Sequence, residues 1–240
     1  MLTPKIRGTI DRRILANYRV DPNVIKKVLP APFRPKLVNG FAIAGICLIR
    51  LRHVRPLFSP FSWGLQSENA AHRIAVEWDF NGQTNEGVFV PRRDTSSWLN
   101  CLAGARLFPG LQHHAKFKVK ETLDELSVSM QSDDCRTRLT VEGSVAKALD
   151  ASSGFASLTV ASDFFQRGAI GYSPSRTAGR YDGMELCCDR WNVEALQVSR
   201  IESSFFENTD VFPSGSIEFD CALLMRGIQH EWHAQSPLCC

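Results

Sequence analysis

The stretch Glu68–Phe80, E-N-A-A-H-R-I-A-V-E-W-D-F, decides the fold class of this chain. Its even positions include the apolar residues Ile74, Val76 and Trp78, whereas its odd positions are mostly polar. This period of two is typical of a β-strand with one buried face. The Asn81-Gly82 pair that follows favours a tight hairpin turn, so the sequence predicts an antiparallel strand pair here.

The beginning of this strand carries two polar side chains on its apolar face. Glu68 and His72 have the same parity as Ile74 and Trp78. A carboxylate on an apolar face must be paired, neutralised or placed near water in a cavity. Two interpretations follow: a frayed strand end that carries polar groups harmlessly, or an internal site with Glu68 and His72 facing a hollow.

The rest of the chain shows further short strands and few helices. Turn signals recur at short spacing without regular alternation of strands and helices, which favours a mainly antiparallel β architecture with about ten strands and three short helices. The expected strands are 6–20, 36–38, 41–54, 68–80, 88–90, 112–121, 125–131, 136–145, 184–188, 193–201 and 217–226, and the expected helices are 23–29, 95–106 and 162–166. Ser162 is expected to cap the last helix.

Composition indicates one globular domain over residues 1–240. Hydrophobic residues make up 44% of the chain and charged residues 22%, and no shift in composition divides it. The net charge of +3 is small and its basic residues are scattered, which argues against nucleic acid or a membrane surface as the partner. We expect a small-molecule ligand instead.

The cysteines and motifs narrow the function classes. The chain has 8 Cys, but it has no CxxC or HxxxH spacing, so neither a metal nor another cofactor is expected. A secretory leader and a membrane-length apolar run are not apparent, which predicts a cytoplasmic protein with reduced thiols. Nucleotide-binding, serine hydrolase and zinc protease signatures are also missing from the sequence.

Four pieces of sequence, taken in order, resemble a known group. They are I-L-A-N-Y-R-V at 14–20, S-E-N-A-A-H-R-I-A-V at 67–76, the 87–92 segment with the helix ending at Ala105-Arg106, and 180–191 followed by 225–232. Together they resemble the uncharacterised YqjF-like bacterial family, which is similar to acetoacetate decarboxylase. The resemblance covers residues 6–232 and implies a cone-shaped antiparallel β-barrel, wrapped by further strands and short helices, with an internal cavity.

The resemblance also implies where the site residues lie. True acetoacetate decarboxylases use a lysine that forms a Schiff base, activated by a neighbouring lysine. Gln112 and His113 stand at those two positions here, so imine chemistry is not expected. Glu68 matches the cavity glutamate of the superfamily. Arg73 matches an arginine of the YqjF-like pattern, and we expect it to pair with Glu77 or Glu86.

Three functions remain open from the sequence. The first is a lyase-type enzyme for a small oxo-acid, with Glu68 as general acid or base and His113 or His72 as a second proton carrier. Arg106 or Arg50 would then hold a carboxylate. The second is a non-catalytic small-molecule binding protein that uses the same cavity, with Gln112 in its wall. The third is a structural homo-oligomer that associates through sheet edges or through the aromatic side chains of Phe58, Phe61 and Trp63.

Overall fold

The computed structural model describes residues 5–58, 64–103 and 110–239. Within these ranges one sheet contains thirteen strands, and three short helices lie beside it, so the mainly β expectation is confirmed. The elements are β1 (Ile6–Val20), α1 (Pro22–Val28), β2 (Arg34–Pro35), β3 (Leu37–Val38), β4 (Phe41–Pro56), β5 (Leu65–Phe80), β6 (Gln83–Thr95), α2 (Trp98–Ala103), β7 (Gln112–Glu121), β8 (Glu125–Ser132), β9 (Arg138–Ala146), α3 (Leu158–Arg167), β10 (Ile170–Pro174), β11 (Arg180–Cys188), β12 (Glu194–Ser203) and β13 (Ile217–Cys239).

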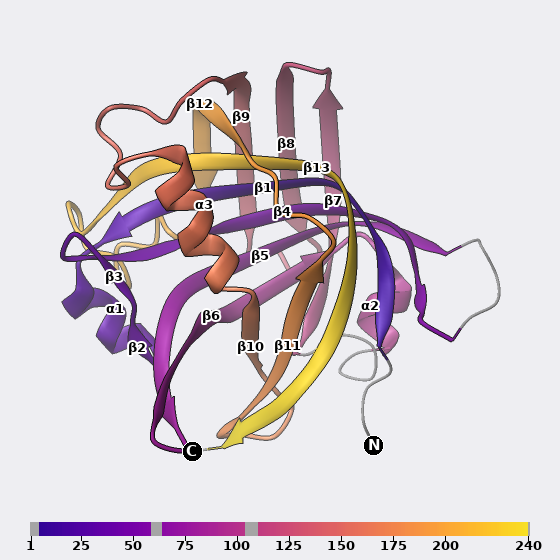
Figure 1. The fold of residues 1–240 in the computed structure, drawn as a ribbon, viewed down its shortest axis with the longest axis horizontal. Helices are drawn as coiled ribbons and strands as arrows, with labels where there is room; N and C mark the ends of the chain where they lie inside the picture. The colour runs from indigo at the N-terminus through magenta and orange to yellow at the C-terminus, as the bar shows by residue number, and fades with distance from the viewer. Residues whose placement is uncertain (1–4, 59–63, 104–109, 240) are drawn as a thin grey trace.

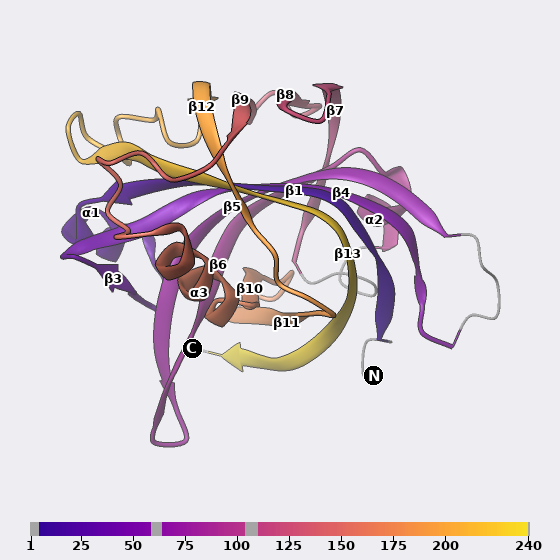
Figure 2. The same ribbon diagram turned by 45° about the horizontal axis from the view of Figure 1, so that its top comes forward.

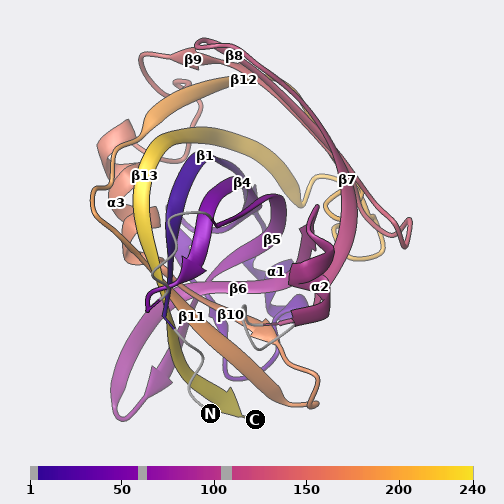
Figure 3. The same ribbon diagram turned by 90° about the vertical axis from the view of Figure 1, so that its right-hand side faces the viewer.

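The strands pair into two rings that share a common wall. The smaller ring runs through β13, β1, β4, β5, β6, β10 and β11, and the β11–β13 pairing closes it. The larger ring leaves the same wall at β6 and returns to β13 through β7, β8, β9 and β12. Figure 3 shows these four strands as an outer arc around the shared strands. Most pairings are antiparallel, but β6 pairs in parallel with β7 and β10.

The shared strands are long because both of their faces are covered. In Figure 1 β13, β1, β4 and β5 run side by side across the molecule, and Figure 2 shows the outer strands standing on one side of them. On that side the main apolar core contains Ile14, Ile46 and Ile74. On the other side, helix α3 contributes Phe164 and Phe165 to a second core. A strand between two covered faces needs apolar residues of both parities, which explains the buried Ala75 at an odd position of β5.

Helix boundaries follow local capping chemistry. The side chain of Asp21 accepts a hydrogen bond from the backbone of Asn23, and Pro22 opens α1 as expected. The expectation for α3 was wrong at its start: Ser157, and not Ser162, caps this helix by accepting from the backbone of Val160. Ser162 lies inside α3, where its hydroxyl accepts a hydrogen bond from Trp191 Nε1 at 3.1 Å.

The C-terminal strand β13 is much longer than its sequence pattern predicted. The expected strand ended at Arg226, whereas β13 continues to Cys239. Gly227 has a φ of 63°, a left-handed value that costs glycine little, and the strand passes through this point. Its first part pairs with β12, and both its first and middle parts pair with β1. Its last part pairs with β11, and this pairing closes the smaller ring.

None of the helices within the described ranges has the length and apolar character needed to cross a bilayer. The thiols described are all unpaired, including the adjacent residues Cys187 and Cys188.

Candidate functional site

A small pocket lies inside the smaller ring. Its volume is about 70 Å³, which is room for a ligand of only a few heavy atoms. Strands β1, β4, β5, β6, β11 and β13 contribute to its wall, while α2 and the first residue of β7 lie at one end. The lining residues are Arg13, Cys47, Ile49, Leu51, Asn69, Ala70, Ala71, Arg93, Asp94, Asn100, Gln112, Met184 and Trp232.

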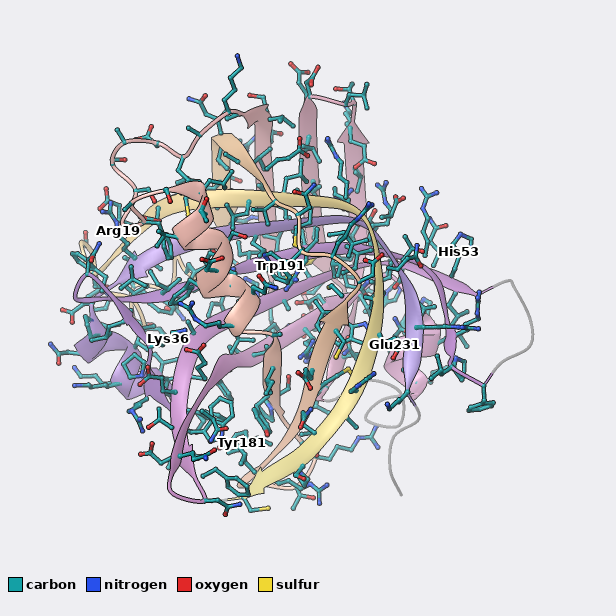
Figure 4. The ribbon with its side chains drawn as sticks, in the orientation of Figure 1. Arg19, Lys36, His53, Tyr181, Trp191 and Glu231 are labelled. Atoms are coloured by element: carbon teal, nitrogen blue, oxygen red, sulfur yellow. The ribbon has the colours of Figure 1, made fainter. Side chains whose placement is uncertain are left out.

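Arg13 reaches this pocket from β1 without an acidic partner. Its Nε donates to Cys47 Sγ at 3.4 Å, and its second contact is Met225 Sδ at 3.9 Å. The guanidinium also lies 5.5 Å from the ring centre of Trp191, which Figure 4 labels beside α3. Sulfur is a weak acceptor, so these contacts leave most of the hydrogen-bonding capacity of Arg13 unused.

Two further arginines lie on the same side of the wall. Arg93 on β6 lines the pocket, and its Nε donates to Ser173 Oγ at 2.9 Å. Arg73 on β5 is 5% exposed, donates to Asn17 Oδ1 and lies 4.7 Å over the ring of Phe165. Within the part of the chain that the structure describes, Arg13, Arg73 and Arg93 form no ion pair. The expected pairing of Arg73 with Glu77 or Glu86 was therefore wrong.

The pKa values of Arg73 and Arg93 reflect this lack of counter-charge. Burial, together with the positive charge of Arg13, lowers the pKa of Arg73 to about 10 against the opposing effects of Cys47 and Cys221. Burial also lowers the pKa of Arg93 to about 10. Both values lie well above neutral pH, so both groups keep their charge in a place where charge is disfavoured. The same pocket wall also contains the carboxylate of Asp94, which Arg92 binds.

Amides and apolar side chains complete the pocket. Asn69 donates to the Ile49 carbonyl and to Ser67, and Asn100 donates to Thr95 Oγ1. Gln112 lines the pocket beside Arg93, since the two residues are paired between the neighbouring strands β6 and β7. The remaining wall is largely apolar. A small carbonyl compound could receive hydrogen bonds from the amide groups while its carboxylate meets a guanidinium.

Glu68 lies on the opposite face of the shared wall from this pocket. Its carboxylate accepts from Arg12 at 2.6 Å and from Arg50 Nε at 2.5 Å, and its side chain is 16% exposed. Arg12 and Arg50 also both pair with Glu121 of β7. The parity argument placed Glu68 correctly on the face of Ile74, but that face packs towards the outer strands. Glu68 and Arg50 are engaged with each other and do not line the pocket.

His72 is a fully buried residue of the main core. Its Nε2 lies 3.0 Å from Ser203 Oγ, and its ring packs 4.6 Å from Phe205 and 5.5 Å from Phe206. Burial, assisted by the charge of Arg92, lowers its pKa to about 3. The ring is therefore neutral at ordinary pH. The structure does not bring it to the arginine-lined pocket, so a substrate contact there is not available to it.

The remaining expected site residues are dispersed. His113 follows Gln112 on β7 but has the opposite parity, and its Nδ1 lies 3.4 Å from Asp134. Burial and the charge of Arg92 lower its pKa despite Asp94 and Asp134. Six residues were expected at the site. Gln112 lines the pocket, whereas Glu68, His72, Arg50 and His113 do not. Arg106 lies outside the described residues.

Sequence reasoning missed Arg13 and Arg93. Both occur in arginine pairs, Arg12-Arg13 and Arg92-Arg93, and neighbouring residues on a strand point to opposite faces. In each pair the first member bonds to a carboxylate while the second faces the pocket. The doubled arginine was thus a usable signal, because adjacent strand residues face opposite sides of a sheet and each pair therefore places one arginine on the pocket side.

The pocket wall contains no lysine. All eight lysines of the chain lie in the described ranges: Lys5, Lys26, Lys27, Lys36, Lys116, Lys118, Lys120 and Lys147. None of them is among the residues that line the pocket.

Solved structures define the class of this fold. Acetoacetate decarboxylase from Legionella pneumophila matches with a TM-score of 0.61 at 12% identity, over 98% of this chain and 88% of that chain. An acetoacetate decarboxylase-like enzyme from Sphingomonas wittichii matches with a TM-score of 0.60 at 12% identity, over 100% and 94%. The enduracididine biosynthesis enzyme MppR, complexed with pyruvate, matches with a TM-score of 0.55 at 10% identity, over 100% and 91%. The fold is therefore acetoacetate decarboxylase-like, as the resemblance predicted.

The family follows from the sequence itself. The chain belongs to DUF2071, an uncharacterized conserved protein family (COG2071), whose model matches residues 8–217. Curated protein sequences give no match.

Proposed function

We propose that this protein binds a small organic anion, of the size of a short oxo-acid, in the pocket of the smaller ring. The observation that carries the proposal is that Arg13 and Arg93 line the pocket without an acidic partner in the described chain. Both guanidinium groups are half-buried, so their charges are partly removed from water, and an anion in the pocket would supply the missing counter-charge. The pocket of about 70 Å³ limits the anion to a few heavy atoms.

The ligand class has support from one structural neighbour. MppR has been solved with pyruvate, a small 2-oxo acid. A carboxylate of this kind would accept hydrogen bonds from Arg13 or Arg93, because charge-assisted bonds of this type are the stronger ones. The amide of Gln112 would donate to the carbonyl oxygen. Ile49, Leu51 and Met184 would cover the short carbon chain.

Calorimetric titration and thermal shift test this function directly. Pyruvate and acetoacetate serve as anionic probes, and pyruvamide serves as the uncharged match for pyruvate. We expect an anionic probe to raise the melting temperature while pyruvamide does not. Arg13→Gln should weaken anion binding by about tenfold or more, since a charge-assisted hydrogen bond contributes about 1.5–3 kcal/mol. Arg200→Gln, in an exposed ion pair with Glu202, is the matched control and should bind normally.

A lyase-type reaction without an imine is the second candidate. The titratable wall residues other than arginine are Cys47 and Asp94, and one of them would have to carry the proton. Burial raises the pKa of Asp94 even though Arg92 binds its carboxylate. Turnover of a 2- or 3-oxo acid that Asp94→Asn abolishes, while anion binding persists, would support catalysis. If these oxo acids bind but none is turned over, the protein is a non-catalytic binding protein.

Borohydride trapping separates both candidates from decarboxylation through a Schiff base. Because no lysine lines the pocket, reduction in the presence of acetoacetate should give no adduct on any pocket peptide. Mass spectrometry of the digested protein checks this expectation. A reduced adduct on a lysine would contradict the assignment of the pocket.

Self-association stays a prediction of the sequence. Phe58 is 80% exposed, and Trp98, Leu99 and Leu102 of α2 are also exposed, whereas Phe61 and Trp63 lie outside the described residues. Sedimentation over a wide concentration range tests it, and a monomer throughout would argue against it.

A further inference from the structure

A thiol, an imidazole and a carboxylate lie in a row on strands β11 and β13, away from the arginine-lined pocket. Cys187 Sγ is 3.8 Å from His233 Nδ1, and His233 Nε2 is 2.8 Å from Glu231 Oε2. Antiparallel pairing places Cys187 directly opposite Glu231, with His233 diagonal to it on the same face. Figure 4 labels Glu231 on the descending part of β13, beside the start of β1.

The arrangement fixes which ring nitrogen of His233 can accept a proton. A carboxylate only accepts hydrogen bonds, so the contact with Glu231 requires a proton on Nε2. The neutral imidazole then presents the lone pair of Nδ1 to the thiol of Cys187. His233 is thus oriented as a base toward sulfur by Glu231, which is the relation between nucleophile, base and orienting group found in activated nucleophiles.

This row borders an open groove that also contains positive charge, because Arg7 pairs across the strands with Glu231, and Arg55 with Arg7. The groove has a volume of about 350 Å³ and is lined by Cys187, Cys188 and Glu231 together with Arg7 and Arg55 of β1 and β4. Arg7 forms no ion pair among the described residues, and its buried Nε has no hydrogen-bond partner there. Asp189 supplies an opposing charge to the groove, but its side chain is exposed. A ligand carboxylate could therefore meet the unpaired guanidinium of Arg7.

The resting state of the sulfur is the thiol. Burial, with Glu185 and Glu231 nearby, raises the pKa of Cys187, although Lys5 acts in the opposite direction. Only the thiolate attacks electrophiles well, so a thiol with a raised pKa reacts slowly unless a neighbouring base removes its proton. The contribution of His233 can therefore be measured as the rate at which the Cys187 thiol reacts with and without this imidazole.

We propose that Cys187, His233 and Glu231 form a reactive-thiol site for small disulfides that carry a carboxylate, which Arg7 binds. The S–H proton of Cys187 passes to Nδ1 of His233 as sulfur attacks one sulfur of the disulfide. A new S–S bond forms with Cys187, the disulfide bond of the substrate breaks, and the departing thiolate takes the proton from His233. The exchange consumes one thiol and one disulfide and needs no external oxidant.

Brief reaction with two probes at neutral pH tests the site. Dithiobis(nitrobenzoate) carries two carboxylates, whereas dithiodipyridine is uncharged, and digestion with mass spectrometry measures the adduct at each cysteine. With the anionic probe we expect Cys187 to react about tenfold faster than the exposed Cys135, since an adjacent base accelerates proton transfer by that order or more. Cys188 is the matched control, because it borders the same groove without an imidazole contact among the described hydrogen bonds.

Two variants separate the roles of the base and the anion contact. His233→Gln should slow Cys187 by about tenfold with both probes, because it removes the base. Arg7→Gln should slow Cys187 with the anionic probe alone. Circular dichroism and melting temperature establish that each variant folds. Equal rates at Cys187 and Cys135, an unchanged rate in His233→Gln, or equal slowing with both probes in Arg7→Gln would each overturn the proposal.

Discussion

A guanidinium group inside a protein is most readily tolerated when a carboxylate accompanies it. In this chain, arginines with a carboxylate partner stand next to arginines without one. Arg12 and Arg92 each bond to carboxylates, whereas their neighbours Arg13 and Arg93 have sulfur or hydroxyl partners. Protein stability alone does not favour the second arrangement, since an apolar residue in the same place avoids the desolvation of the charge. Residues that lower stability in this way commonly serve a site.

Replacing Arg93 with Met tests this trade-off. We expect Arg93→Met to leave unfolding free energy unchanged or to raise it by about 1–2 kcal/mol, because the buried charge is removed and the volume is retained. The same variant should lose stabilisation by pyruvate or acetoacetate. Urea unfolding with and without the anion measures both effects. A variant that is less stable and still responds to the anion would argue that Arg93 is a structural residue.

His72 should make the free energy of unfolding decrease as the pH falls. Its folded pKa is about 3 and its usual value is 6.5, so the unfolded chain takes up the proton first as pH falls. Its neutral form therefore stabilises the fold above pH 6.5, and this contribution is lost progressively below that value. At pH 5 the loss is about 2 kcal/mol, from about 1.4 kcal/mol per pH unit.

The variant His72→Phe should remove this acid sensitivity. The difference in unfolding free energy between pH 7 and pH 5 should be smaller than in the unmodified protein by about 2 kcal/mol. Urea unfolding at the two pH values measures it. His53→Gln, which changes an exposed histidine, is the control and should show the original difference. An unchanged difference in His72→Phe would show that His72 is protonated at the same pH in both states.

At the scale of elements, charged side chains tie four strands together on the outer face of the shared wall. Arg12 of β1 and Arg50 of β4 both bond to Glu68 of β5 and Glu121 of β7. Burial acts to raise the pKa of Glu121, but hydrogen bonds from Arg12 and Arg50 outweigh it and the net shift is downward. The cluster therefore joins the outer strands to the shared wall, and Glu68 is its central carboxylate.

Glu68→Gln should consequently act on stability. Arg12 is 2% exposed, and loss of one of its two carboxylates should cost about 3 kcal/mol of unfolding free energy. Glu202→Gln, which breaks the exposed pair with Arg200, should cost less than about 1 kcal/mol. Denaturant unfolding compares the two variants. Anion affinity in Glu68→Gln should stay close to that of the unmodified protein, and its loss would show that Glu68 communicates with the pocket.

At the scale of the whole molecule, the two rings cannot be separated without breaking shared strands. Strands β13, β1, β4, β5 and β6 belong to both rings. Each ring supplies the partner strands and one of the cores that cover this wall. The arrangement therefore favours folding of the chain as a single unit, which is also what its uniform composition predicted.

Calorimetry tests this expectation of one domain. We expect a single unfolding transition in which the calorimetric and van't Hoff enthalpies agree, because exposure of the shared wall destabilises both rings at once. Two resolved transitions, or a van't Hoff enthalpy far below the calorimetric value, would show that the rings unfold independently.

The sequence by itself determined most of the strands, their facing and the class of fold, but not the strands at 34–35 and 170–174 or the end of β13. Period-two alternation fixed β1 and β7 at their observed bounds and placed Glu68 and His72 on the face of Ile74, because strand geometry depends on neighbouring residues alone. Ordered motifs indicated the YqjF-like family, which the match to DUF2071 shows, and the acetoacetate decarboxylase-like fold. Local chemistry likewise predicted the start of α1 at Asp21-Pro22.

Tertiary structure decided which face of the shared wall carries the pocket. Parity along β5 separates Glu68 from Asn69, but it does not state what lies over either face. That depends on closure of the smaller ring between β11 and β13, which are distant in the sequence. The part of β13 that pairs with β11 lies beyond Arg226, where the sequence analysis expected this strand to end. The same closure brings Arg13 and Arg93 together from β1 and β6, and it sets Cys187 beside His233.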